Sequence, residues 1–368
     1  MDLGERAMSS VYLEWAKLES AARYNLATSG MMSYPLAGLP VSIADLEING
    51  PTLYGYEPLQ ERLARKCGVA PENVVAASGT SGANFLAMAA VVEPGDDVLV
   101  EWPAYGILLE VASHLGANIL RFERRFEDGF QIDPAEVRAK ITAKTRLIVL
   151  TNLHNPSGAY TSEETLRELG AIAATVGARV LVDEVYLDMV PEKLLGWPAR
   201  SSFHLGDNFL VTNSLTKAYG LSGIRCGWIL ADAELARRIW RLSDLVYGTP
   251  VHVGELLSAI ALDNLPRIHE RARRLLAVNR IALDKFLDSR SGLEVLRPIG
   301  GTVIFPRLGT GSVEKFSALL REKYETSVVP GRYFEMADHF RVGIGGDGAM
   351  TAEGLGRLGA ALEEFGAC

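Results

Sequence analysis

Short apolar runs alternate, along residues 57–231, with segments whose apolar residues recur at helical spacing. The apolar runs predict strands at 74–77, 97–100, 119–122, 146–150, 179–182, 208–211 and 228–231. The segments between them predict helices at 59–66, 82–92, 105–115, 134–141 and 162–175. Repeated alternation of this kind is typical of a mostly parallel sheet that is covered by helices on both faces. We therefore expect an α/β fold for this part of the chain.

The pattern changes beyond Asp263. One long helix is predicted over residues 266–288, with Ile268, Leu275, Ala282 and Phe286 at helical spacing. Short strands are then predicted at 293–296, 302–306, 327–329 and 340–344, and helices near 312–323 and 350–364. This order of elements predicts a smaller α+β unit, and we place the change of domain inside the long helix.

The N-terminal segment differs from both units. Val11, Leu13, Trp15 and Leu18 predict a short amphipathic helix within residues 8–22. Residues 25–52 show no period and contain several Gly and Pro residues, so we expect this segment to lie across another surface. The predicted division is a large domain of residues 45–270 and a small domain that combines residues 1–44 with 271–368.

Composition and charge narrow the functional classes. The chain has 368 residues, enough for two cores, and a formal net charge of −8 without a long basic run, which gives little support to nucleic-acid binding. No apolar run approaches the roughly 18 residues of a membrane span, so no membrane partner is expected. Cys67, Cys226 and Cys368 have no metal-ligand or disulfide spacing, so we expect a cytoplasmic protein without a metal.

The stretch from Ser214 to Trp228 places one lysine, Lys217, between small polar residues and a glycine-punctuated turn. Arg225 follows eight residues later and precedes an apolar run. A lysine in such a loop can form a Schiff base with a carbonyl, and pyridoxal phosphate is the cofactor that needs one. Its phosphate also needs an arginine and hydroxyl groups. The alternative is a surface lysine on a Gly-rich loop.

Three other stretches fit the same chemistry. The residues at 78–82, Ser-Gly-Thr-Ser-Gly, join a strand to a helix, where free backbone N–H groups suit a phosphate. Asn155 follows a buried strand, at the edge where open α/β sheets bind ligands. Asp183 ends another buried strand, and a cofactor ring nitrogen would be a fitting partner for its carboxylate; Tyr186 follows three residues later. Each stretch alone could instead be an ordinary turn, a helix cap or a core tyrosine.

Together these stretches resemble the class I/II aminotransferase family of fold type I pyridoxal-phosphate enzymes over nearly the whole chain. The resemblance rests on Ser-x-x-Lys with an arginine eight residues after the lysine, on Asn-Pro-x-Gly at 155–158 and on Asp-x-x-Tyr at 183–186, all in the family's order. It implies an aspartate-aminotransferase-like architecture with a large and a small domain. It also implies pyridoxal 5'-phosphate as the cofactor.

The resemblance implies roles for the residues that would surround the cofactor ring. Lys217 corresponds to the lysine that holds the cofactor as a Schiff base and moves the substrate Cα proton. Asp183 corresponds to the partner of the ring nitrogen, and Asn155 and Tyr186 to the pair that bonds the ring oxygen. Tyr105 corresponds to the aromatic side chain that stacks on the ring.

The remaining implied roles concern the phosphate and the substrate. The phosphate would be held by Gly79, Thr80, Ser214 and Arg225. Arg341 corresponds to the arginine that binds the substrate α-carboxylate through its planar fork, with Asn155 beside it. Gly30 lies where the family's N-terminal segment offers a backbone N–H to the same carboxylate.

Two positions depart from the family pattern. Where relatives often carry a tyrosine that reaches the partner subunit's phosphate, this chain has Gly50, and Tyr54 or Tyr56 could take over that contact. Aspartate-specific relatives take a second arginine from a loop that corresponds to residues 246–251, and this loop contains none. A dicarboxylic substrate is therefore not favoured.

The resulting hypothesis is a homodimeric aminotransferase that moves an amino group from an amino acid to a 2-oxo acid. A fold type I lyase or cyclase remains an alternative, because eliminations and cyclisations on this scaffold begin with the same loss of the Cα proton. A non-catalytic amino-acid sensor is a further alternative, although the lysine, aspartate and arginine are all present.

Overall fold

The computed structural model describes residues 6–191, 199–290 and 292–366. A seven-stranded sheet forms the larger unit, in the order β4-β10-β9-β8-β7-β5-β6, and only β10 runs antiparallel to its neighbours. The strands are β4 (Val74–Ser78), β5 (Asp97–Trp102), β6 (Asn118–Glu123), β7 (Thr145–Thr151), β8 (Arg179–Asp183), β9 (Phe209–Ser214) and β10 (Cys226–Leu230). The mostly parallel sheet expected from the sequence is confirmed.

Helices cover both faces of this sheet because successive residues of a strand point to opposite sides. On β7, Leu147 and Val149 face one core, and Ile148 and Leu150 face the other. The first core is closed by α2 (Glu57–Cys67), α3 (Gly79–Ala89), α4 (Gly106–His114), α8 (Ala233–Ser243) and α9 (His252–Asp263). The second is closed by α5 (Pro134–Lys140) and α6 (Glu163–Ala174).

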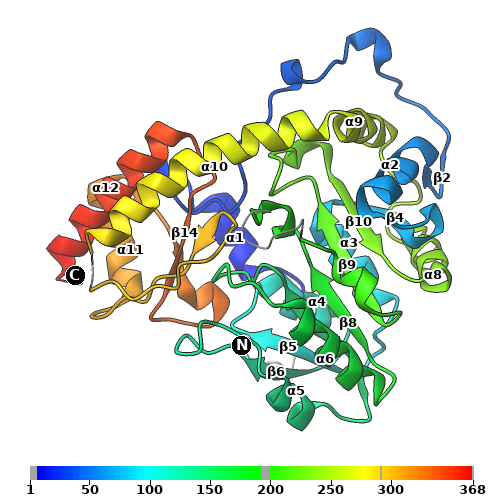
Figure 1. Ribbon diagram of the computed structural model, residues 1–368, viewed down its shortest axis with the longest axis horizontal. Helices are drawn as coiled ribbons and strands as arrows, with labels where there is room; N and C mark the ends of the chain where they lie inside the picture. The colour runs from blue at the N-terminus through cyan, green and yellow to red at the C-terminus, as the bar shows by residue number, and fades with distance from the viewer. Residues whose placement is uncertain (1–5, 192–198, 291, 367–368) are drawn as a thin grey trace.

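The smaller unit is built on the 24-residue helix α10 (Leu265–Asp288), which leads away from α9 toward the C-terminal elements (Figure 1). It packs with α11 (Val313–Tyr324) and α12 (Gly348–Phe365). These helices share a core with the antiparallel sheet of β11 (Val303–Ile304), β14 (Phe340–Gly343) and β13 (Val329–Pro330). The predicted boundaries of the two domains stay a prediction.

One predicted strand is wrong. Residues 293–296 form no strand; Glu294 makes a single isolated bridge to Arg307, and Leu293 packs into the core of the smaller unit. The predicted strand at 327–329 is divided between β12 (Thr326–Ser327) and β13. Leu293 and Val328 of these segments pack in one core with α10, α11 and α12. This packing, rather than pairing with a neighbouring strand, sets the conformation of the two segments.

The N-terminal segment contacts both units: Met31 and Leu39 pack into the core of the larger one, and β1 (Tyr24–Asn25) pairs with a strand of the smaller one. Helix α1 (Val11–Leu18) joins an aromatic cluster with Phe130 of the larger unit and Phe334 of the smaller one. Beyond it, β1 pairs in parallel with β12. The hairpin of β2 (Thr52–Leu53) and β3 (Gly55–Tyr56) follows and leads into α2.

The glycines at 343–346 have a packing role. The backbone of residues 26–30 approaches β14 so closely that a Cβ at Gly343 or Gly345 would collide with Thr28 or Gly30. This contact brings the N-terminal segment to the edge of β14, beside Arg341.

Among the described helices, none has both the length and the apolar character needed to cross a bilayer.

Candidate active site

The predicted site residues come from the carboxyl ends of β7, β8 and β9, the start of α3, and β14 of the smaller unit. Parallel strands end at one edge of a sheet, so Asn155, Asp183 and Lys217 meet there although they are far apart in sequence. The charge of Lys217 acts to lower the pKa of both Asp183 and Tyr12. The three side chains therefore lie close to one another.

The candidate phosphate cradle forms where β4 turns into α3. Gly79 has a φ of +68° and its N–H donates to the Arg225 carbonyl across 2.8 Å. A Cβ at Gly79 would collide with the Arg225 guanidinium, so only glycine allows the arginine to lie over the start of the helix. Thr80 Oγ1 donates to Ser214 Oγ at 2.8 Å, which joins the helix to the end of β9.

One residue near this cradle was not predicted from the sequence. The N–H of Thr216 donates to Ser214 Oγ at 3.2 Å, and the Thr216 hydroxyl oxygen is buried without a hydrogen-bond partner among the described residues. Buried hydroxyls are normally satisfied, so an acceptor or donor from a ligand would complete this one.

Asp183 is buried at the end of β8, where Asn84 Nδ2 donates to its Oδ2 at 2.9 Å and the Val185 N–H donates to its Oδ1 at 3.1 Å. Thr212 in turn donates to Asn84 Oδ1 at 2.5 Å, so the amide orientation is fixed. Burial raises the pKa of Asp183 to about 6, and the Asn84 bond acts in the opposite direction. The carboxylate is thus oriented and ready for a cationic partner.

Lys217 lies in the loop between β9 and β10, against the N-terminal segment. Its carbonyl accepts a hydrogen bond of 2.8 Å from the Met31 N–H. A Cβ at Gly30 would lie 3.2 Å from the Lys217 Cδ, a tight contact that a larger residue would turn into a clash. Gly30 therefore lies beside Lys217 in the structure, while its predicted contact with a substrate carboxylate stays a prediction.

Arg341 is completely buried on β14 and forms no ion pair with any Asp or Glu of the described ranges. Its Nη1 donates to Asn155 Oδ1 at 2.9 Å, and its Nη2 donates to the Tyr12 hydroxyl at 2.9 Å and to the Ala27 carbonyl at 3.1 Å. Nε has no partner within the described structure. A buried guanidinium without a carboxylate lacks its counter-charge, which a ligand carboxylate would supply.

Three tyrosines line the space between Arg341 and Asp183. The rings of Tyr12 and Tyr105 meet edge to face with centroids 5.7 Å apart, and Tyr186 is buried nearby. Burial, together with Tyr12, Tyr186 and Asp183, raises the pKa of Tyr105 well above its usual value. Burial opposes the ionisation of Tyr12, yet Arg341 and Lys217 hold the pKa of Tyr12 below its ordinary value.

Tyr12 and Asn84 are site residues that the sequence analysis missed. Tyr12 lies on a helix distant in sequence from every motif, and nothing in the local pattern marks it. Asn84 carried a usable signal: it is a polar residue four positions after Thr80 on an otherwise apolar helix, so both side chains share one face.

The two tyrosines considered for a contact with a partner subunit are engaged within this chain. Tyr54 accepts a hydrogen bond of 2.7 Å from Arg241 and donates one of 3.0 Å to Asp244. The ring of Tyr56 lies edge-on against His252, with centroids 5.0 Å apart. Gly50 lies so close to His252 that any side chain there would collide with the imidazole.

The residues present fit pyridoxal phosphate. The cradle at Gly79 suits a phosphate, the Asp183 carboxylate suits a protonated ring nitrogen, and the charge of Lys217 lowers the pKa of both Asp183 and Tyr12 against the effect of burial. The unpaired hydroxyl of Thr216 and the unpaired Nε of Arg341 are two buried polar atoms that bound ligands would satisfy.

The comparison with known proteins agrees with this chemistry. Capreomycidine synthase from Streptomyces vinaceus is 30% identical over 341 residues, which cover 88% of this chain and 85% of that protein. An aspartate aminotransferase from Pyrococcus horikoshii is 28% identical over 298 residues, or 79% of this chain and 76% of its own. A PLP-dependent aminotransferase from Streptococcus suis superimposes with a TM-score of 0.90 at 27% identity and covers 99% of both chains.

The family described as aminotransferase class I and II matches residues 47–358, which include every predicted site residue except Gly30. Aminotransferases related to this chain act on small-molecule substrates, namely amino acids and 2-oxo acids. Because the match spans most of the chain and the whole fold agrees, this chain belongs to the class I and II aminotransferases and is a pyridoxal-phosphate-dependent enzyme of fold type I.

Proposed function

We propose that this enzyme transfers the amino group of an amino acid to a 2-oxo acid at the site centred on Lys217, with Arg341 as the anchor of the substrate α-carboxylate. The observation that carries the proposal is the buried Arg341, which has three hydrogen bonds to neutral groups and no carboxylate partner among the described residues. An α-carboxylate is common to the amino donor and the 2-oxo acceptor, so one arginine would serve both half-reactions.

The cofactor would be held by the residues of the sheet edge. Gly79, Thr80, Ser214 and Arg225 would bind its phosphate, and Asp183 would keep its ring nitrogen protonated. A guanidinium only donates, so Asn155 Oδ1 must face Arg341, and its Nδ2 is left to donate to the ring oxygen beside Tyr186. When bound, pyridoxal phosphate supplies the electron sink on which the amino group is carried.

Lys217 would remove the proton from the substrate Cα and pass it to the bound cofactor, and in the second half-reaction it would move a proton in the opposite direction. The hydrogen bond from the Met31 N–H to the Lys217 carbonyl and the end of β9 fix the backbone of the loop that carries the lysine. The Lys217 side chain therefore extends from a fixed backbone position. Tyr105 would stack on the cofactor and limit the access of water. The substrate side chain would then point toward Tyr12 and the N-terminal segment.

The second candidate is a cyclisation or elimination that begins with the same removal of the Cα proton. It is favoured by one observation, the 30% identity to a protein named as a synthase rather than a transaminase. Asp183, Lys217 and Arg341 would serve that reaction as well, because they act before the two paths separate.

We further propose a homodimer in the cytoplasm, without a nucleic-acid or membrane partner. Large apolar side chains are exposed on two segments: Ile43, Ile48 and Leu53 near β2, and Leu245 and Val251 between α8 and α9. The segment that leads to β2 loops away from the body of the molecule (Figure 1). An apolar depression of about 390 Å³ lies between Arg225 and Val251, next to the phosphate cradle. A second copy would cover these surfaces. The free thiols of Cys67 and Cys226 agree with a reducing compartment.

The test mixes stoichiometric enzyme with single amino acids in the absence of a 2-oxo acid. A transaminase releases one equivalent of 2-oxo acid per active site, retains the nitrogen and stops until an acceptor is added. A lyase or cyclase continues without acceptor. Continued product formation from one amino acid, with no dependence on a 2-oxo acid, would replace the first candidate by the second.

A further inference from the structure

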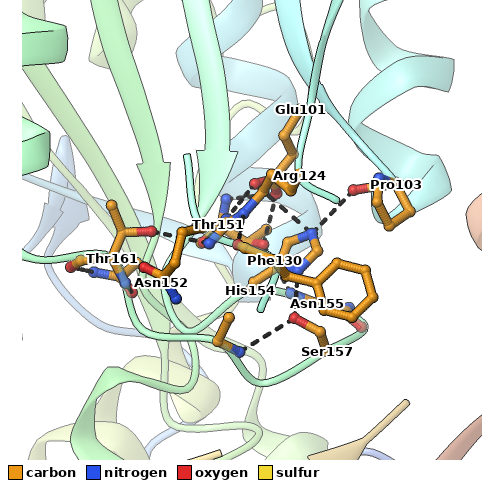
Figure 2. A network of polar contacts seen from close by, with 12 residues as sticks. Glu101, Pro103, Arg124, Phe130, Thr151, Asn152, His154, Asn155, Ser157 and Thr161 are labelled. Atoms are coloured by element: carbon orange, nitrogen blue, oxygen red, sulfur yellow. Dashed lines mark hydrogen bonds and ion pairs between the residues drawn. The ribbon is translucent and has the colours of Figure 1, made fainter. Parts of the chain in front are cut away.

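A buried ion pair lies beneath the loop that carries Asn155 (Figure 2). Arg124, just after β6, contacts Glu101 of β5 with Nη1 and Oε2 2.7 Å apart, and both side chains are fully buried. Burying two charges costs about as much free energy as the pair regains, and apolar side chains of similar size often stabilise a core equally well. The pair therefore calls for a role besides joining two strands.

Apart from one bond to the Phe130 carbonyl, the other hydrogen bonds of the pair go to Thr151 and Thr161. Arg124 donates from Nε to the Phe130 carbonyl at 2.7 Å and from Nη2 to Thr161 Oγ1 at 3.0 Å. These contacts leave the second carboxylate oxygen of Glu101 free for Thr151, whose N–H and hydroxyl donate to it at 2.8 Å and 2.7 Å. One oxygen of the ion pair thus holds both polar groups of Thr151 (Figure 2).

These bonds have a defined direction. A carboxylate paired with an arginine only accepts, so the hydroxyl proton of Thr151 must point toward Glu101. The lone pairs of that hydroxyl are then turned toward the loop, where Thr151 Oγ1 accepts the Asn155 N–H at 2.8 Å. The threonine hydroxyl therefore connects the ion pair to the backbone of Asn155.

The side chain of Asn155 extends the connection to the substrate arginine. Asn155 Oδ1 accepts from Arg341 Nη1 at 2.9 Å, so a continuous line of bonds runs through Arg124, Glu101, Thr151, Asn155 and Arg341. None of the hydrogen bonds found for Arg124 within the described residues goes directly to a predicted site residue. A displacement of the Asn155 backbone would move its amide relative to both Arg341 and the cofactor.

We propose that Thr151, fixed by the Glu101–Arg124 ion pair, is a positioning residue that sets the Asn155 amide against Arg341 and against the ring oxygen of the cofactor. The inference rests on the proposed roles of Asn155 and Arg341. It assigns the buried ion pair to the geometry of the active site rather than to the stability of the fold.

The test compares three variants of the holoenzyme. Thr151→Val keeps the shape and removes the hydroxyl, and Thr151→Ser keeps the hydroxyl. Thr145→Val is the matched control: Thr145 is equally buried at the opposite end of β7, and its Oγ1 accepts the Thr142 N–H at 2.9 Å. The measurements are the affinity for an unreactive 2-methyl amino acid, the pH midpoint of the bound cofactor's absorbance, and the thermal midpoint.

We expect Thr151→Val to weaken binding of the 2-methyl amino acid about five- to tenfold, the equivalent of one hydrogen bond. The absorbance midpoint should move to higher pH, because a less well placed Asn155 amide stabilises the anionic ring oxygen less. Thr151→Ser should restore both values to within about twofold. Thr145→Val should lower the thermal midpoint and leave both values unchanged.

Thr151→Val behaving like Thr145→Val in binding and absorbance would overturn the inference, as would a Thr151→Ser variant no better than Thr151→Val. If Thr151→Val does not fold, Glu101→Gln takes its place, because a glutamine no longer forces the hydroxyl proton of Thr151 to one side; the same two values should change, and unchanged values would also refute the role. Neither measurement needs turnover, so an enzyme that proves not to be a transaminase leaves this test intact.

Discussion

Asn84 Nδ2 donates to Asp183 Oδ2 across 2.9 Å and joins the middle of α3 to the end of β8. The start of α3 bears Gly79 and Thr80 of the candidate phosphate cradle, so one helix contacts both ends of the proposed cofactor site. The phosphate position and the Asp183 carboxylate are thereby kept at a fixed separation. Substitutions of Asn84 and Gly79 on α3 therefore test the two ends of the proposed cofactor site separately.

The first prediction concerns the pH dependence of cofactor affinity. Burial raises the pKa of Asp183 to about 6, and a protonated cofactor nitrogen needs the ionised carboxylate, so affinity should rise as pH increases through about 6. Asn84→Leu removes a donor to the ionised form and should move this midpoint to higher pH. Titration of apoenzyme with pyridoxal phosphate between pH 5 and 8 measures the shift. Asn279→Leu, at a buried asparagine of the smaller unit, is the control and should leave the midpoint in place.

The second prediction concerns the phosphate cradle. Gly79→Ala forces a Cβ into a left-handed backbone and against Arg225, and we expect a loss of cofactor affinity of about tenfold or more. Gly82→Ala lies three residues later on the same helix, where the nearest atom to the new Cβ is 3.5 Å away, and it should bind cofactor normally. Equal cofactor affinities in the two variants would contradict the assignment of the cradle.

The third prediction concerns Arg341. Arg341→Lys keeps the charge and loses the planar fork, so it should weaken every amino-acid substrate by about 10- to 100-fold. Arg341→Ala should reduce the binding free energy of amino-acid substrates by about 2–5 kcal/mol. The corresponding decarboxylated amines should bind both variants as they bind the native enzyme. Arg280→Lys serves as the control, since Arg280 bonds only to the carbonyls of Gly300 and Gly301. Spectral titration gives these affinities; a uniform loss for amines and amino acids would argue against the role.

The fourth prediction concerns Tyr12. Tyr12→Phe removes the hydroxyl that accepts from Arg341 Nη2 and should raise KM for amino acids about three- to tenfold, with kcat changed by less than about twofold. Trp15→Phe changes a buried ring of the same helix that stacks near Tyr333, and should alter stability without this effect on KM. Steady-state kinetics at several acceptor concentrations gives KM and kcat for each of the two variants.

The fifth prediction concerns the lysine that holds the cofactor. Reduction of the holoenzyme with borohydride should fix the cofactor mass on the peptide that contains Lys217. Lys217→Ala should still bind cofactor through the phosphate contacts and should not turn over. Lys66 is another half-buried lysine, but its ammonium is held by Asp188 at 3.1 Å. A label found on Lys66 by peptide mass mapping would refute the assignment of the site.

Apolar periodicity was sufficient to predict the seven strands of the large sheet and the long helix α10, because each of these elements has its own period and its own turn signals. The strand predicted at 293–296 failed for the opposite reason: Leu293 is buried by helix packing, and a short apolar segment carries no sign of whether it pairs or packs.

The sequence by itself determined the family and the local chemistry, since the lysine loop, Asn-Pro-Ser-Gly at 155–158 and Asp183 are short motifs that occur together in the family's order. Only the tertiary structure decided which distant groups complete the site. Tyr12 reaches Arg341 across 329 positions, and Glu101 acts on Asn155 through Thr151, because packing of α1 and the register of β5 against β7 bring them together. Such contacts depend on side-chain directions in three dimensions, which no spacing along one chain encodes.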